Sequence, residues 1–119
     1  IGMNALSRCV YLEEICAPNV STIDERAFAG FIMLEKVTLG ELTDVRGEAN
    51  SGGGIFDDDN WTPYIDLYLP KNQEVMKGEF DENSNQYIWK PTGEKYFASS
   101  DYDNGIFLGY QFNSVKSWE

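Results

Sequence analysis

Apolar residues recur in the first half of the chain at a constant spacing of 22 residues. Residues 12–17 (Leu-x-x-Ile-x-Ala) return as residues 34–39 (Leu-x-x-Val-x-Leu), and the apolar positions of residues 1–6 return in residues 23–28. Aligned apolar positions at a period near this length are typical of a solenoid, in which each unit buries its apolar face against its neighbours. The pattern therefore predicts stacked repeats.

A third copy follows, lengthened by insertion. Val45 takes the place of Ile23, and Phe56 takes the place of Phe28. The strand pattern then returns at Leu67, which lies 30 residues after Val37, so this unit carries eight extra residues. We place them in Gly-rich and acidic loops, because such residues lack apolar surface and accept unusual backbone angles.

Each unit is expected to hold one strand and one short helical turn. In residues 34–39, the side chains of Val37 and Leu39 face one side, and those of Lys36 and Thr38 face the other. Residues 22–25 (Thr-Ile-Asp-Glu) have the spacing of a capping box and predict a helical turn over residues 26–29. The predicted fold class is an α/β solenoid, β-rich, built of leucine-rich-repeat units; the alternative is an ordinary small helix–strand domain with accidental self-similarity.

The repeat ends near residue 72. Residues 86–97 predict a hairpin with its turn at Pro91-Thr92-Gly93, and the alternation in residues 106–112 predicts one half-buried strand. We therefore divide a single domain into repeat units at 1–72 and a C-terminal β-rich cap at 73–119. The first repeat would have no such cover, which predicts self-association through an open N-terminal repeat face. Because the chain begins inside a repeat, we expect it to be a piece excised from a longer array.

Composition narrows the possible partners. The chain has 119 residues, which suits one domain, and its net charge of −11 disfavours nucleic acid and anionic membranes as partners. No apolar run approaches the roughly 20 residues that cross a bilayer, so we expect no membrane insertion. We expect no disulfide between Cys9 and Cys16, no zinc and no cofactor, because these cysteines lie on different elements and His is absent.

The outward side of the predicted strands is the candidate ligand-binding face. Stacking would align its exposed side chains, which belong to Glu14, Lys36, Thr38, Asp66 and Tyr68. Aligned side chains of this kind recognise proteins or glycans, and Tyr provides a large contact area at a small entropic cost. The alternative is a plain solvated surface.

Two acidic loops are weak calcium candidates. They contain Asp57 and Asp59, and Asp101 and Asp103. Calcium binds six to eight oxygens, and carboxylates in such loops can supply several. Neither loop has the EF-hand spacing, and Asp or Asn before Gly is also a common turn former.

The sequence gives no support for catalysis. Without His, a Ser–His or Cys–His constellation cannot form within the chain. A carboxylate pair could hydrolyse a glycoside, but no pattern marks a cleft. Residues 52–54 (Gly-Gly-Gly) lack the Lys-Ser/Thr that follows in a phosphate-binding loop. We interpret the chain as not an enzyme.

Residues 1–72 resemble a known family. Residues 23–39 (Ile-Asp-x-x-Ala-Phe-Ala-Gly-x-x-x-Leu-x-x-Val-Thr-Leu) are similar to the BspA-like leucine-rich repeat of bacterial cell-surface proteins. Cys9 occupies the family's cysteine position in the first copy, whereas Phe31 replaces it in the second. The resemblance implies an extracellular or cell-surface location and an adhesion-type, non-catalytic binding function with a protein or glycan partner. The alternative is a structural cap that ends a longer array and has no ligand of its own.

Overall fold

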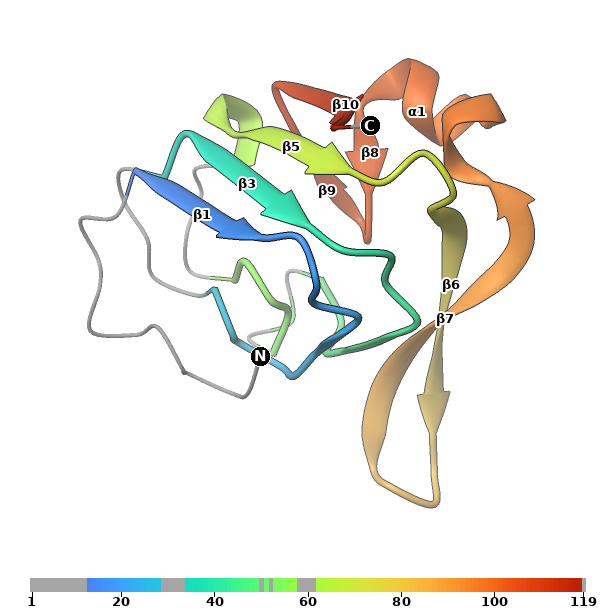
Figure 1. Cartoon of the computed structure of the whole chain (residues 1–119). Helices are drawn as coiled ribbons and strands as arrows, with labels where there is room; N and C mark the ends of the chain where they lie inside the picture. The colour runs from blue at the N-terminus through green and yellow to red at the C-terminus, as the bar shows by residue number, and fades with distance from the viewer. Residues whose placement is uncertain (1–12, 29–33, 50, 52, 58–61, 119) are drawn as a thin grey trace.

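Four short parallel strands form the first sheet of the computed structural model, which describes residues 13–28, 34–49, 51, 53–57 and 62–118 (Figure 1). They are β1 (Glu14–Ala17), β3 (Lys36–Leu39), β5 (Asp66–Leu69) and β10 (Ser114–Ser117), in the spatial order β1-β3-β5-β10. β1 pairs with β3 at an offset of 22 residues, so that Ile15 lies beside Val37. Successive side chains of a strand point to opposite faces of the sheet, so one apolar residue in each strand can face the core. Each strand has such a buried residue, namely Ile15, Val37, Leu67 and Val115.

A second, mixed sheet has the order β2-β4-β7-β6. β2 (Thr22–Ile23) pairs in parallel with β4 (Asp44–Arg46), and β4 pairs antiparallel with β7 (Gln86–Lys95). β6 (Glu74–Asp81) forms a long antiparallel hairpin with β7, and this hairpin projects from the body of the molecule (Figure 1).

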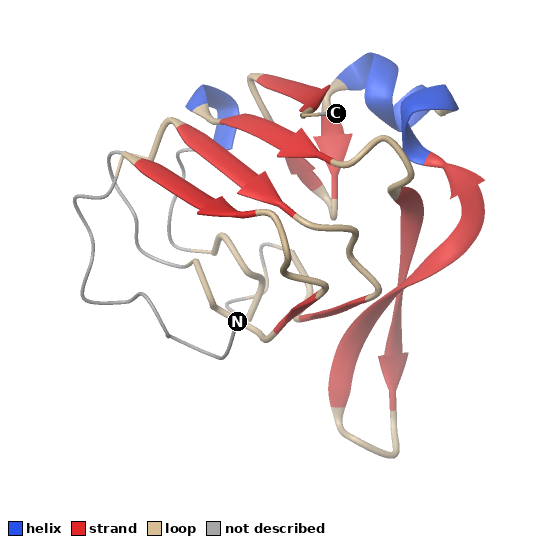
Figure 2. Cartoon of the chain, viewed as in Figure 1, coloured by secondary structure: helices blue, strands red, loops and turns tan. Residues whose placement is uncertain are grey.

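Short elements complete the described chain. β8 (Ile106–Phe107) and β9 (Tyr110–Gln111) form a two-stranded sheet. The helical segments are the 3-10 turns η1 (Thr62–Tyr64) and η2 (Tyr96–Ala98) and the five-residue α1 (Ser100–Asn104). Figure 2 shows how little of the described chain is helical. No helix in this part of the chain is long and apolar enough to span a bilayer.

One hydrophobic core joins the inward side chains of the parallel sheet to those of β2, β4 and the C-terminal segments. An aromatic cluster holds its centre, because the ring of Phe56 lies 5.3 Å from that of Phe28 and 5.5 Å from those of Tyr110 and Phe112. Its remaining fully buried members include Ile23, Ala27, Leu34, Val37, Leu39, Leu42, Val45, Ile65, Leu67, Leu69 and Tyr96. The core thus contains residues from both the predicted repeat and the predicted cap.

The predicted α/β solenoid of leucine-rich-repeat units is wrong. The molecule is a small compact β-rich domain with mixed parallel and antiparallel sheets and almost no helix among the described residues. Residues 22–23 of the supposed capping box form strand β2, and residues 25–28 form a turn. Arg26 has φ 57°, a left-handed backbone that a right-handed helical turn does not accept.

The predicted hairpin turn at residues 91–93 is also wrong. β7 runs without interruption through Pro91, and the turn lies at residues 82–85, where Asn85 has φ 57°. The Asp81 carboxylate fixes this turn by accepting hydrogen bonds from the backbone N–H of Asn83 (3.1 Å) and the Ser84 hydroxyl (2.9 Å). Pro91 is tolerated because it lies beside the irregularity at Glu74/Met76, beyond the residues of β7 that pair with β4.

The single strand predicted over residues 106–112 is divided in two. Leu108 (φ 53°) and Gly109 (φ 79°) make a tight turn between β8 and β9. Positive φ at both central residues is the geometry of the two-residue hairpin turn that matches strand twist.

The predicted cap region contributes strands to both sheets. β10 extends the parallel sheet beside β5, and the hairpin of β6 and β7 extends the mixed sheet beside β4. Residues 1–12, which carry the predicted open repeat face, lie outside the described residues, as does Cys9.

Candidate functional site

The outward side of the parallel sheet brings the predicted ligand-binding residues together. Strand register aligns Glu14, Lys36, Asp66 and Ser114 in one row across the sheet, and Cys16, Thr38, Tyr68 and Lys116 in a second row. We call these eight residues the sheet face. All five predicted binding residues therefore lie on three adjacent strands, although Thr38 is buried, at 8% exposure, between Cys16 and Tyr68 of the neighbouring strands.

Lys36 links the two rows of the sheet face. Its Nζ lies 3.7 Å from Oε1 of Glu14 and 4.9 Å from the centre of the Tyr68 ring. An exposed ion pair stabilises a fold by at most about 1 kcal/mol, and a cation over an exposed ring contributes a similar amount. These contacts therefore order the side chains at the surface more than they stabilise the fold.

Asp66 is held by β10, the strand that sequence reasoning missed, and by the residue before it. Its Oδ1 accepts hydrogen bonds from the Ser114 hydroxyl (2.7 Å) and the Asn113 amide (2.8 Å). These bonds, first that of Ser114 and then that of Asn113, hold the pKa of Asp66 below its ordinary value of 3.8. The alternation of Val115 between Ser114 and Lys116 is the signal that could have identified β10.

This carboxylate makes stability depend on pH. Because the folded-state pKa of Asp66 is lowered, its contribution is present above pH 3.8 and disappears as the pH falls through the lowered value. We expect Asp66→Asn to unfold at a lower temperature than the wild type at pH 7, and the difference to be smaller at a pH below the lowered pKa, where the carboxyl group of Asp66 is protonated. Thermal melts followed by circular dichroism at both pH values test this; a difference that stays constant would show that the Asp66 charge is not the cause.

Aromatic residues flank the sheet face at both ends of its strands. Tyr64, just before β5, is 64% exposed. Trp118, just after β10, is 41% exposed, and its indole N–H donates to the carbonyl of Leu39 (2.9 Å). The third aromatic residue of this region, Trp61, lies outside the described residues.

The calcium candidates are placed in different surroundings. Asp57 is 4% exposed, and its carboxylate accepts a hydrogen bond from the Tyr110 hydroxyl (2.5 Å), which fastens its loop to β9. It also accepts one from the backbone N–H of Gly54 (2.8 Å), within the loop itself. Asp101 and Asp103 lie in α1, whose first turn is capped by Ser99, and Asp59 is outside the described residues. Within the described part of the chain, no group of three or more acidic or Cys side chains could hold a metal ion.

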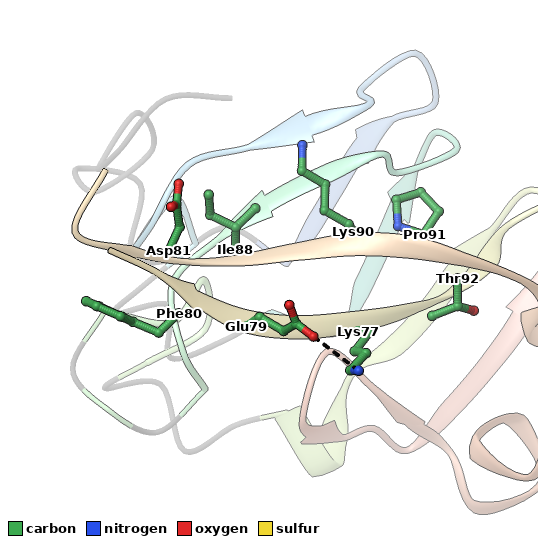
Figure 3. A pocket seen from close by; sticks show the side chains of 8 residues that line it. All are labelled: Lys77, Glu79, Phe80, Asp81, Ile88, Lys90, Pro91 and Thr92. Carbon is green, nitrogen blue, oxygen red and sulfur yellow. Dashed lines mark ion pairs between the residues drawn. The ribbon is translucent and has the colours of Figure 1, made fainter. Parts of the chain in front are cut away.

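A second surface lies on the projecting hairpin, which sequence reasoning missed because it misplaced the turn. There, a shallow groove of about 590 Å³ is lined by Lys77, Glu79, Phe80, Asp81, Ile88, Lys90, Pro91 and Thr92 (Figure 3). Three of the lining residues form ion pairs: Nζ of Lys77 lies 3.1 Å from Oε1 of Glu79, and Nζ of Lys90 donates a hydrogen bond to Asp44 (2.8 Å). Asp44 also accepts a hydrogen bond from Arg46 (2.8 Å). The hydrogen bond from Arg46 is the main reason that the pKa of Asp44 is lowered.

Comparison with known proteins assigns no family. No protein-family model, curated protein or solved structure matches this chain. The resemblance to BspA-like repeats therefore rests on the sequence pattern alone, and the sheet face is defined by its geometry.

Proposed function

We propose that this protein is a non-catalytic binding module that recognises another protein through the sheet face. The alignment of charged and aromatic side chains on adjacent strands carries this proposal. Lys36 contacts both Glu14 and Tyr68 on the neighbouring strands, and together the three side chains expose both charge and ring surface.

The shape and chemistry of the sheet face favour a protein over a small ligand. One groove lies away from the sheet face, on the hairpin, and another, between α1 and β10, reaches the sheet face only at Ser114 and Lys116. Glu14, Lys36 and Tyr68 line neither groove. A surface without a deep pocket suits recognition by broad contact, in which Tyr side chains contribute much of the binding energy. The extracellular location that the sequence resemblance implies stays a prediction.

Binding arrays test the proposal. Fluorescently labelled wild-type protein is applied to an array of extracellular proteins and to an array of glycans. The face variant, Glu14→Ala/Lys36→Ala/Tyr68→Ala, keeps the net charge at −11 because it removes one acid and one base. We expect wild-type binding to one or more proteins and at least roughly tenfold weaker binding by the face variant.

The matched control is Lys71→Ala/Glu82→Ala, which also removes one acid and one base, at exposed turn positions outside the sheet face. It should bind like the wild type. Binding to glycans alone would reject the protein partner, and equal binding by the face variant would reject the sheet face as the site. Circular dichroism of all variants shows whether each is folded.

A further inference from the structure

β6 forms an open edge of the mixed sheet. It is the last strand in the order β2-β4-β7-β6, and the described part of the chain places no strand on its other side. β6 is eight residues long, and β4 supports β7 only at Trp89 and Ile88. An edge of this length offers a row of backbone donors and acceptors to another strand.

The hairpin also leaves apolar surface in contact with water. Phe80, near the hairpin tip, is 57% exposed, and its cross-strand neighbour Tyr87 is only partly buried. A two-stranded ribbon is marginally stable in water and gains from a third strand. Both features point to a partner that pairs with β6.

The charge pattern of β6 is complementary to itself. Lys77 and Glu79 flank Gly78, so an antiparallel second copy centred on Gly78 places Lys77 of each copy opposite Glu79 of the other. The same register places Met76 opposite Phe80, on the other face of the ribbon. Opposite charges directly across an antiparallel pair are favourable, and each pair occurs twice about a two-fold axis.

Gly78 suits the position on this axis. The ring of Tyr87 occupies the space of its missing side chain, since a Cβ there would lie 2.3 Å from Tyr87 Cε1. Two glycines meeting at the axis bring no side chains of their own to this position. The side chains of Lys77 and Glu79 are 71% and 70% exposed and are therefore accessible to a second copy.

We propose that β6 pairs antiparallel with β6 of a second copy of this chain, joining the two mixed sheets into one continuous sheet across a two-fold axis at Gly78. This surface differs from the sheet face, so the inference stands independently of the proposed function. The proposed dimer is also different from the self-association predicted from the sequence, because it uses Lys77 and Glu79 of β6 and not the N-terminal repeat face.

Light scattering coupled to size exclusion tests the register. We expect the wild type to reach twice its 13.5 kDa mass as concentration rises. Lys77→Glu and Glu79→Lys each replace two attractive pairs with two repulsive ones, which should weaken the dimer at least roughly tenfold. Mixed together, the two variants regain complementary charges and should form a heterodimer, and the double swap Lys77→Glu/Glu79→Lys should again form a homodimer.

Lys71→Glu is the control for net charge, because it makes the same charge change as Lys77→Glu at an exposed turn position outside both β6 and the sheet face. It should dimerise like the wild type, and melting curves confirm that every variant is folded. A wild type that stays monomeric, single variants that still dimerise, or a mixture that does not associate would each overturn the proposal. Equal loss of association in Lys71→Glu and Lys77→Glu would also overturn it, because net charge and not the pairing of Lys77 with Glu79 would then be the cause.

Discussion

Phe56→Ala is expected to lower the free energy of unfolding by about 3–5 kcal/mol, the usual cost of truncating a buried Phe. Phe56 is 2% exposed and lies at the centre of the aromatic cluster, within 5.5 Å of the rings of Phe28, Tyr110 and Phe112. Those rings come from distant parts of the sequence, so the cavity would loosen the contact between the N-terminal strands and the C-terminal segments. Urea unfolding followed by tryptophan fluorescence measures the change.

Phe80→Ala is the matched control, because it makes the same truncation at a residue that is 57% exposed. At a protein concentration low enough for a monomer, its effect should stay within about 0.5 kcal/mol. Equal losses in the two variants would mean that the aromatic cluster is not the centre of the core.

The apolar periodicity predicted much of the core but not the architecture. Val37, Leu39 and Leu67 are buried on parallel strands, as their spacing indicates. A strand pattern reports which side chains face inward, and it does not report which strands become neighbours. The solenoid prediction assumed that each unit stacks only on its neighbours along the chain, whereas β4 pairs on its other side with an antiparallel strand from 40 or more residues later.

The sheet face could be predicted only in part, because its strands come from distant parts of the sequence. Alternation placed Lys36, Asp66 and Tyr68 outward on successive strands. The fourth strand, with Ser114 and Lys116, arrives from the far end of the sequence, and no local pattern records that return. The positions of the tight turns were the part of the fold that the sequence predicted least well. Arg26, Asn85 and Leu108 all have positive φ in these turns, but of the three residue types only Asn favours that conformation.

Gln73 exemplifies a contact that no periodicity predicts. It is fully buried, and its side chain bonds both backbone groups of Leu42: Oε1 accepts from the Leu42 amide (2.7 Å), and Nε2 donates to the Leu42 carbonyl (3.4 Å). Nε2 also donates to the carbonyl of Glu74 (2.9 Å). The side chain thus makes the hydrogen bonds that a neighbouring strand would make with Leu42, and it joins the segment after β3 to the start of β6.

Gln73→Leu is therefore expected to lower the free energy of unfolding by about 2–4 kcal/mol, because it leaves buried backbone groups without their partner. Gln111→Leu is the control: Gln111 also bonds a backbone carbonyl, that of Asn104 (2.7 Å), but it is exposed, so water can replace the bond. Urea unfolding of both variants gives the comparison, and hydrogen exchange at the Leu42 amide locates the effect. A large loss for Gln73→Leu with unchanged protection of Leu42 would show that side-chain packing, and not this hydrogen bond, is what Gln73 supplies.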